Sequence, residues 1–183
     1  RSAINLGFQK SFMLNPFATF INTDMAFGRE WLLNLVKYAR EDRIVNCVQI
    51  ERFPTIHHQV KDFGEIPNVN MEDFELFAES IKEDMLMSEQ EWQQRMGNNP
   101  YVRADATPNL LHISTFKELN GWDVTVDRMQ PIPSDMDFFN RAKKMGIQNM
   151  KSIGSVVYHS SQGETKRMRA KYGENIIEPG VQK

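Results

Sequence analysis

Cysteine, long apolar runs and net charge are all scarce in this sequence. The single cysteine, Cys47, excludes an internal disulfide, and its apolar surroundings (RIVNCVQIE) predict a buried thiol in a reducing compartment, so we expect a cytoplasmic protein. No apolar run approaches the roughly 20 residues that cross a bilayer, and we expect no transmembrane segment. A net charge of −2 gives no general attraction to a phosphate backbone, so we expect no nucleic-acid partner.

The composition is that of an ordinary globular protein, and the length of the chain fits a single domain. The 183 residues are 40% apolar and 25% charged, and a domain near this size buries about 70% of its unfolded surface. Residues 17–22 predict a buried strand, residues 28–42 a core-facing helix and residues 43–53 a second strand. The order strand, helix, strand implies a right-handed crossover with parallel pairing, and therefore an α/β sheet.

The rest of the chain predicts further helices and at least one more strand. Residues 71–96 carry the apolar stripe of a long acidic helix or helix pair, and residues 107–123 predict a strand-like piece followed by a short helix. A helix is expected to begin with Ser134 as its N-cap and to end just before Gly146. The last β-branched strand is expected to end at His159.

Three polar side chains stand where apolar elements begin or end: Asp24 after the first strand, Asp135 in the first turn of a helix and His159 after the last strand. Ligands of open α/β sheets bind beyond the carboxyl ends of strands, so we expect Asp24 and His159 to converge on Mg²⁺ or, with a histidine ligand, Mn²⁺. A structural interpretation of each residue stays open. Asp24 would then be a turn former, Asp135 would complement the helix dipole, and His159 would be a half-buried histidine bonded to the backbone.

Six short motifs follow one another in a particular order along the chain. They are Asn5-Leu6-Gly7, Asn22-Thr23-Asp24, Trp31-Leu32, Asn120-Gly121-Trp122-Asp123, Ser134-Asp135-Met136-Asp137 with Arg141 and Gly146, and Val156-Val157-Tyr158-His159. Each motif is short, but their order and context resemble those of the inverting family 2 glycosyltransferases of the GT-A fold.

The resemblance implies a GT-A-like, Rossmann-like fold, in which a mostly parallel sheet is flanked by helices. It covers residues 1–165, with an acidic helical insertion at about 54–99, and leaves residues 166–183 as a basic C-terminal tail. The strand, helix and strand that bind the nucleotide in that family would precede residue 1.

The resemblance also implies an activity, the transfer of a sugar from a nucleotide-sugar donor to a carbohydrate or other hydroxyl acceptor with inversion. Asp24 and His159 would hold Mn²⁺ or Mg²⁺ on the donor diphosphate, and Asp135 would be the general base that takes the proton of the acceptor hydroxyl. Donor contacts would come from Asn5, Gly7, Asn22, Lys166 and Arg167, and acceptor contacts from Trp122 and Asp123.

Two other functions stay open on the sequence. One is a non-catalytic carbohydrate-binding or scaffold domain derived from a glycosyltransferase, for which the neutral Asn22 argues. The other is a metal hydrolase that uses His57, His58 and His159. Adjacent histidines point to opposite sides of an extended chain, so His57 and His58 would make a poor chelating pair.

Overall fold

The computed structural model describes residues 16–52, 59–97, 108–122 and 134–160, which form a seven-stranded sheet with helices on both faces. The strands are β1 (Phe17–Phe20), β2 (Met25–Phe27), β3 (Arg43–Glu51), β4 (Gln59–Val60), β5 (Leu86–Ser88), β6 (Asn109–His112) and β7 (Gln148–His159). The helices are α2 (Trp31–Val36), α3 (Met71–Ile81), α4 (Glu89–Arg95), α5 (Ile113–Glu118) and α6 (Ser134–Lys144). None of the helices in the described ranges is long and apolar enough to cross a membrane.

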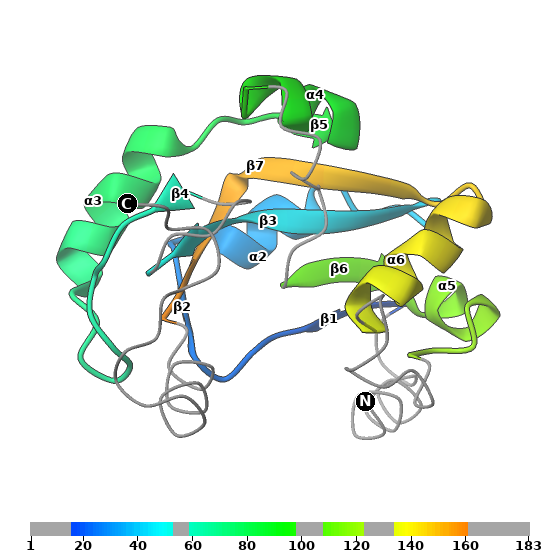
Figure 1. The fold of residues 1–183 in the computed structure, drawn as a ribbon, viewed down its shortest axis with the longest axis horizontal. Helices are drawn as coiled ribbons and strands as arrows, with labels where there is room; N and C mark the ends of the chain where they lie inside the picture. Colours follow the sequence, from blue (N-terminus) through cyan, green and yellow to red (C-terminus); the bar gives the residue numbers. More distant parts are fainter. Residues whose placement is uncertain (1–15, 53–58, 98–107, 123–133, 161–183) are drawn as a thin grey trace, which may run out of the picture.

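The sheet is mixed and mostly antiparallel. Its strand order is β1-β6-β3-β7-β2, with β4 beside β3 and β5 beside β7 (Figure 1). Strand β3 runs parallel to β7 and β4, whereas the β1–β6, β3–β6, β2–β7 and β5–β7 pairs are antiparallel. The sheet curls into half of a barrel.

The expected GT-A-like fold, a mostly parallel Rossmann-like sheet with an acidic helical insertion, is therefore wrong. Strand β1 pairs with β6 instead of β3, so the order strand, helix, strand at 17–53 does not make two neighbouring parallel strands. Residues 25–27, expected to lead into a helix, instead pair with β7 as β2. The segment expected as a helical insertion contains α3 and α4 but also supplies β4 and β5 to the sheet. These strands are only two and three residues long, too short to show a strand period in the sequence.

The parallel pair of β3 and β7 forms the centre of the sheet. The register runs from Arg43 opposite Gln148 to Glu51 opposite His159, with a shift between Cys47 and Val48. Nearly every residue of both strands is buried, as expected of parallel strands covered on both faces. This register fixes which side chains meet at the carboxyl ends of the two strands.

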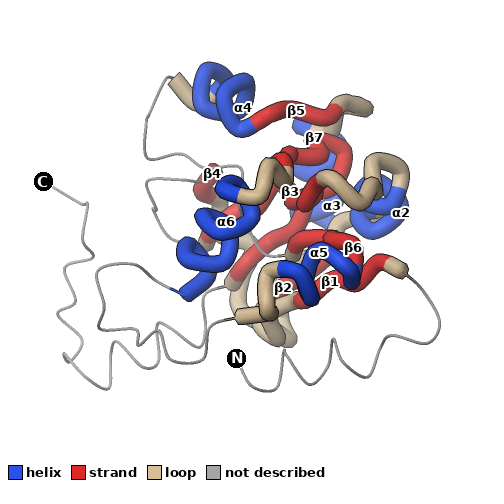
Figure 2. Tube along the Cα trace, turned by 90° about the vertical axis from the view of Figure 1, so that its right-hand side faces the viewer, coloured by secondary structure: helices blue, strands red, loops and turns tan. Residues whose placement is uncertain are grey.

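Side chains alternate between the two faces of β3, and different helices cover each face. On one face Val45 and Cys47 pack against Leu35 of α2. On the other face Ile44 packs with α5 and α6, while Val48 and Ile50 pack with α3 and α4. In Figure 2, α2 lies on one side of the strands, and α4 and α6 lie on the opposite side.

Cys47 is expected to be inert to alkylation in the folded chain. It is fully buried beside Ser155, and burial raises the pKa of its thiol to about 12, so at about pH 8 only on the order of one thiol in 10⁴ is ionised. Mass spectrometry after iodoacetamide treatment should show no native labelling and complete labelling in guanidinium chloride. Rapid native labelling would contradict this placement of β3. Because the folded pKa lies above the unfolded one, alkaline pH above about 9 should weaken folding through this group.

Candidate functional site

Asp24 lies in the turn between β1 and β2 and is held against the end of β7. The backbone N–H of Ser160 donates to the Asp24 carbonyl oxygen over 3.0 Å, and the Ser160 hydroxyl donates to the same oxygen over 3.1 Å. One residue on, Met25 pairs with His159 in the antiparallel β2–β7 ladder. These contacts fix the Asp24 backbone and leave its carboxylate to interact across the sheet edge.

The imidazole of His159 lies between two carboxylates. Its Nε2 is 3.4 Å from Asp24 Oδ1, and its Nδ1 is 3.1 Å from both carboxylate oxygens of Glu51. The side chains of Asp24, His159 and Glu51 are 19%, 11% and 6% exposed, so all three are shielded while Asp24 keeps the most contact with solvent. A carboxylate only accepts hydrogen bonds, so Glu51 fixes the direction in which the His159 ring points.

Glu51 reaches His159 because the β3–β7 register places the two residues opposite each other. Gln49, two residues earlier on the same face of β3, donates its side-chain N–H to Glu51, and its Nε2 lies 3.3 Å from His159 Nδ1. The backbone N–H of Arg52 continues the pairing by donating to the His159 carbonyl over 3.2 Å. His159 is therefore held through both its backbone and its ring.

A second set of hydrogen bonds fixes the loop that follows β4. The Tyr158 hydroxyl donates to the Gly64 carbonyl over 2.9 Å, and the Arg52 guanidinium pairs with Asp62 and Glu65 over 3.1 and 2.6 Å. The pKa of Asp62 is held below its ordinary value, first by the Gly64 N–H that it accepts over 2.7 Å and also by Arg52. These bonds position the strand ends on which the site stands.

The separation of Asp24 Oδ1 and His159 Nε2 fits two ligands of one cation. Neighbouring ligands at bond lengths of about 2.1 Å lie about 3 Å apart around an octahedral ion, close to the observed 3.4 Å. Glu51 lies at the opposite ring nitrogen, in the position of the carboxylates that orient metal-binding histidines. Within the described ranges no group of three or more His, Cys, Asp or Glu side chains is arranged to hold a metal ion. Asp24 and His159 would thus supply two ligands, with substrate and water supplying the others.

The remaining residues expected at the site are placed as follows. Asn22 is exposed in the same turn as Asp24. Trp122 is only 5% exposed, and its ring stacks on Phe138 of α6 at 4.6 Å. Helix α6 carries Asp135 at its start, but the side chain of Asp135 lies outside the described part. Also outside it are Asn5, Gly7, His57, His58, Asp123, Lys166 and Arg167.

Helix α6 is anchored at the end of β3 remote from His159. Its buried Phe138 and Ala142 pack with Ile44, near the start of β3. Glu51, the residue that contacts His159, ends the same strand. At about 3.3 Å per residue, the two ends are roughly 20 Å apart.

Sequence reasoning pointed to Asp24 and His159 but missed Glu51 and Gln49. The signal that could have found them is the alternation in RIVNCVQIE, which puts two polar side chains on the face of the strand shared with Val45 and Cys47. Both residues are buried, at 4% and 8% exposure. No protein-family model and no curated protein matches the chain.

Proposed function

We propose that the chain transfers a sugar from a nucleotide-sugar donor to a carbohydrate or other hydroxyl acceptor, with Asp24 and His159 binding Mn²⁺ or Mg²⁺. The observation that carries the proposal is the 3.4 Å approach of Asp24 Oδ1 to His159 Nε2, from two segments far apart in the sequence. The order of the short motifs around these residues supports sugar transfer over other metal-assisted reactions. The single buried cysteine supports a reducing, cytoplasmic setting for the reaction.

The side chains of the site have separate roles in this proposal. With a cation bound, Glu51 would accept the Nδ1–H of His159, which leaves the lone pair of Nε2 for the cation beside the carboxylate of Asp24. A bound cation would supply charge neutralisation to the nucleoside diphosphate as it leaves. The shielding of Glu51 and His159 from water would strengthen the attraction between a bound cation and both the carboxylate of Asp24 and the diphosphate.

Asp135 is the proposed general base on the strength of its position in the motif order alone. Its helix α6 packs near the start of β3, roughly 20 Å from the strand end that carries Glu51, so this role requires the start of α6 to approach the donor when donor and acceptor are bound. It would take the proton of the acceptor hydroxyl while that oxygen attacks the anomeric carbon from the face opposite the leaving group. Asp137 in the same helix offers a matched comparison, because its carboxylate is paired with Arg141 at 2.8 Å. Asp135→Asn should abolish transfer. Asp137→Asn should leave transfer in place and lower the free energy of unfolding by only roughly 0.5 kcal/mol, the contribution of an i,i+4 ion pair.

The proposal is tested by the release of nucleoside diphosphate from a panel of nucleotide sugars, with simple glycosides as acceptors. Release is expected in the presence of Mn²⁺ or Mg²⁺ and should stop when EDTA removes the cation, because the leaving diphosphate then departs uncompensated. Release that is equally fast in EDTA would refute the metal-assisted mechanism. The absence of release from every donor would refute the proposed transfer by this chain.

A second candidate is a non-catalytic carbohydrate-binding or scaffold domain. The observation that favours it is the carboxylate on each side of the His159 ring, since such a buried ion-pair cluster is also a structural device that requires no substrate. In that case Mn²⁺ would not bind at Asp24, and no donor would be turned over.

A further inference from the structure

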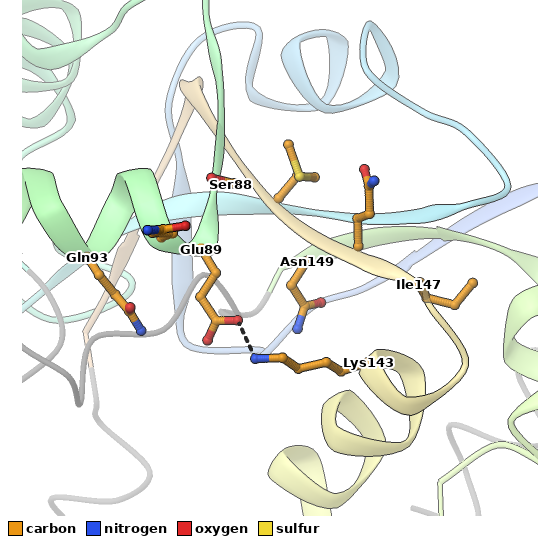
Figure 3. A pocket seen from close by; sticks show the side chains of 9 residues that line it. Ser88, Glu89, Gln93, Lys143, Ile147 and Asn149 are labelled. Atoms are coloured by element: carbon orange, nitrogen blue, oxygen red, sulfur yellow. Dashed lines mark hydrogen bonds and ion pairs between the residues drawn. The ribbon is translucent and has the colours of Figure 1, made fainter.

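A groove lies between α4, α6 and the first residues of β7, at the opposite end of β7 from His159. Its volume is about 730 Å³, within the range of small-molecule binding sites. Figure 3 shows Gln93 and Glu89 on one side, Lys143 on the other, and Asn149 between them on the strand. The groove is therefore built by three separate elements of the chain.

Asn149 supplies the observation that points to a ligand. Its side chain lines the groove and the residue is 9% exposed, yet its Oδ1 has no hydrogen-bond partner. The ladder between β5 and β7 ends with Ser88 opposite Met150, so the groove opens where that ladder stops. A buried acceptor without a donor destabilises the folded chain, and a hydrogen bond from a ligand hydroxyl would remove that penalty.

The other lining groups define the chemistry of the ligand. Primary amides both donate and accept hydrogen bonds, and four of them line the groove, namely Gln90, Gln93, Gln148 and Asn149. The cation of Lys143 and the anion of Glu89 lie 3.5 Å apart, so the pair is neutral overall and favours neither an anionic nor a cationic ligand. Ile147 and Met150 add apolar surface beside these polar groups.

We propose that this groove is a binding site for a neutral saccharide. Saccharide hydroxyls match the mixed donors and acceptors of the amides, and one of them would donate to Asn149 Oδ1 once this buried amide turns towards the groove. The C–H face of the sugar would cover Ile147 and Met150. Nucleic acid is a poor match for a groove whose single lysine is paired with a carboxylate.

The groove is separate from the Asp24–His159 pair. Asn149 is opposite Ile44 and His159 is opposite Glu51, so seven residues of β3, or roughly 20 Å, separate the two sites. The proposal does not rest on the proposed sugar transfer, because it concerns binding at a place where no reacting group is assigned. It describes a surface site that would hold a glycan away from any chemistry at His159.

Saturation-transfer NMR tests the proposal with three probes, maltotriose, cellotriose and chitotriose. At least one probe should receive saturation from the 183-residue chain. Asn149→Leu should weaken its binding at least about 10-fold, because the substitution removes the acceptor that the hydroxyl bonds. Gln93→Ala should also weaken binding, whereas Gln94→Ala should not, because Gln94 is exposed next to Gln93 but does not line the groove.

Two results would overturn the proposal: no saturation transfer to any of the three probes, or binding that neither Asn149→Leu nor Gln93→Ala weakens. If Asn149→Leu does not fold, Gln93→Ala against Gln94→Ala decides the matter, since both glutamines lie on the surface helix α4. The variant Glu79→Ala should bind the probe as the parent chain does, because Glu79 is an exposed carboxylate paired with Lys82 and does not line the groove. Loss of binding in Glu79→Ala equal to that in Asn149→Leu would refute the groove.

Discussion

Replacing Asp24 with alanine is expected to reduce the turnover of nucleotide sugar at least about 100-fold, because outer contacts of a metal ligand alone are worth 10–100-fold. The substitution removes one of the two side chains proposed to hold the cation, and Oδ1 is the atom that faces His159 Nε2 at 3.4 Å. The fold should persist, since Ser160 bonds the backbone carbonyl of residue 24 and not its side chain. The measurement is diphosphate release with Mn²⁺, together with a melting curve of each variant.

Two further variants sharpen this comparison. Glu51→Gln keeps the shape of the side chain but weakens acceptance of the His159 Nδ1–H, and it should lower turnover by about 10–100-fold. Asp42→Ala is the matched control: Asp42 is a half-exposed carboxylate paired with Arg40, and its loss should leave turnover unchanged. Turnover in Asp24→Ala equal to that in Asp42→Ala would remove Asp24 from the mechanism.

Truncation of Phe138 to alanine is expected to destabilise the chain by about 3–5 kcal/mol, the usual cost of removing a fully buried phenylalanine. Phe138 has no exposed surface, stacks on Trp122 at 4.6 Å and lies 5.7 Å from both Phe116 and Phe139. Its loss opens a cavity under α6, among the other buried side chains of the same cluster. The midpoint of thermal unfolding should fall by about 10 °C, at 2–4 °C per kcal/mol for a chain of this size.

Leu33→Ala is the control for that experiment. Leu33 is 63% exposed on α2, and truncation of an exposed apolar side chain is expected to change stability by no more than about 0.5 kcal/mol. If Phe138→Ala melted within about 2 °C of the parent chain, then α6 would not be docked on the aromatic cluster described above. The two variants thus compare the same kind of truncation inside and outside the core.

Local patterns in the sequence predicted many elements that the structure contains. The aromatic and β-branched stretches at β1, β3 and β7 are strands, and β6, α5 and α6 also form near the expected positions. Each of these elements has a strong local signal. In β3 it is the apolar and β-branched content of residues 43–51, and at the end of α6 it is Gly146, which adopts a positive φ of 79°.

Local sequence patterns did not predict which strands pair with one another. Met25–Phe27 and Leu86–Ser88 are only three residues long, too short to show a period, and the second lies within an acidic stretch with helical spacing. Their places beside β7 depend on contacts between residues far apart in sequence. The local order strand, helix, strand therefore predicted that β1 and β3 are parallel neighbours. In the structure β1 pairs with β6 instead.

The expected convergence of Asp24 and His159 is present in the structure, whereas their roles stay a proposal. Asp24 and His159 follow apolar strands in the sequence, and they approach each other because β2 and β7 are paired. Glu51 was missed because a single carboxylate at the end of an apolar strand does not by itself indicate a functional site. Its role becomes visible only when His159 is seen to contact it. Asn149 was missed for a related reason: only the placement of α4 and α6 makes its amide part of a groove.

The most direct test of the account is the coordination of Mn²⁺ by His159, measured by pulsed electron paramagnetic resonance on chain labelled with ¹⁵N-histidine. The account predicts a nitrogen coupling to the bound ion that disappears in His159→Gln. It should persist in His112→Gln, whose ring caps α5 by accepting from Ser114. Bound Mn²⁺ without nitrogen coupling, or coupling that survives in His159→Gln, would contradict the claim that Asp24 and His159 form the metal site.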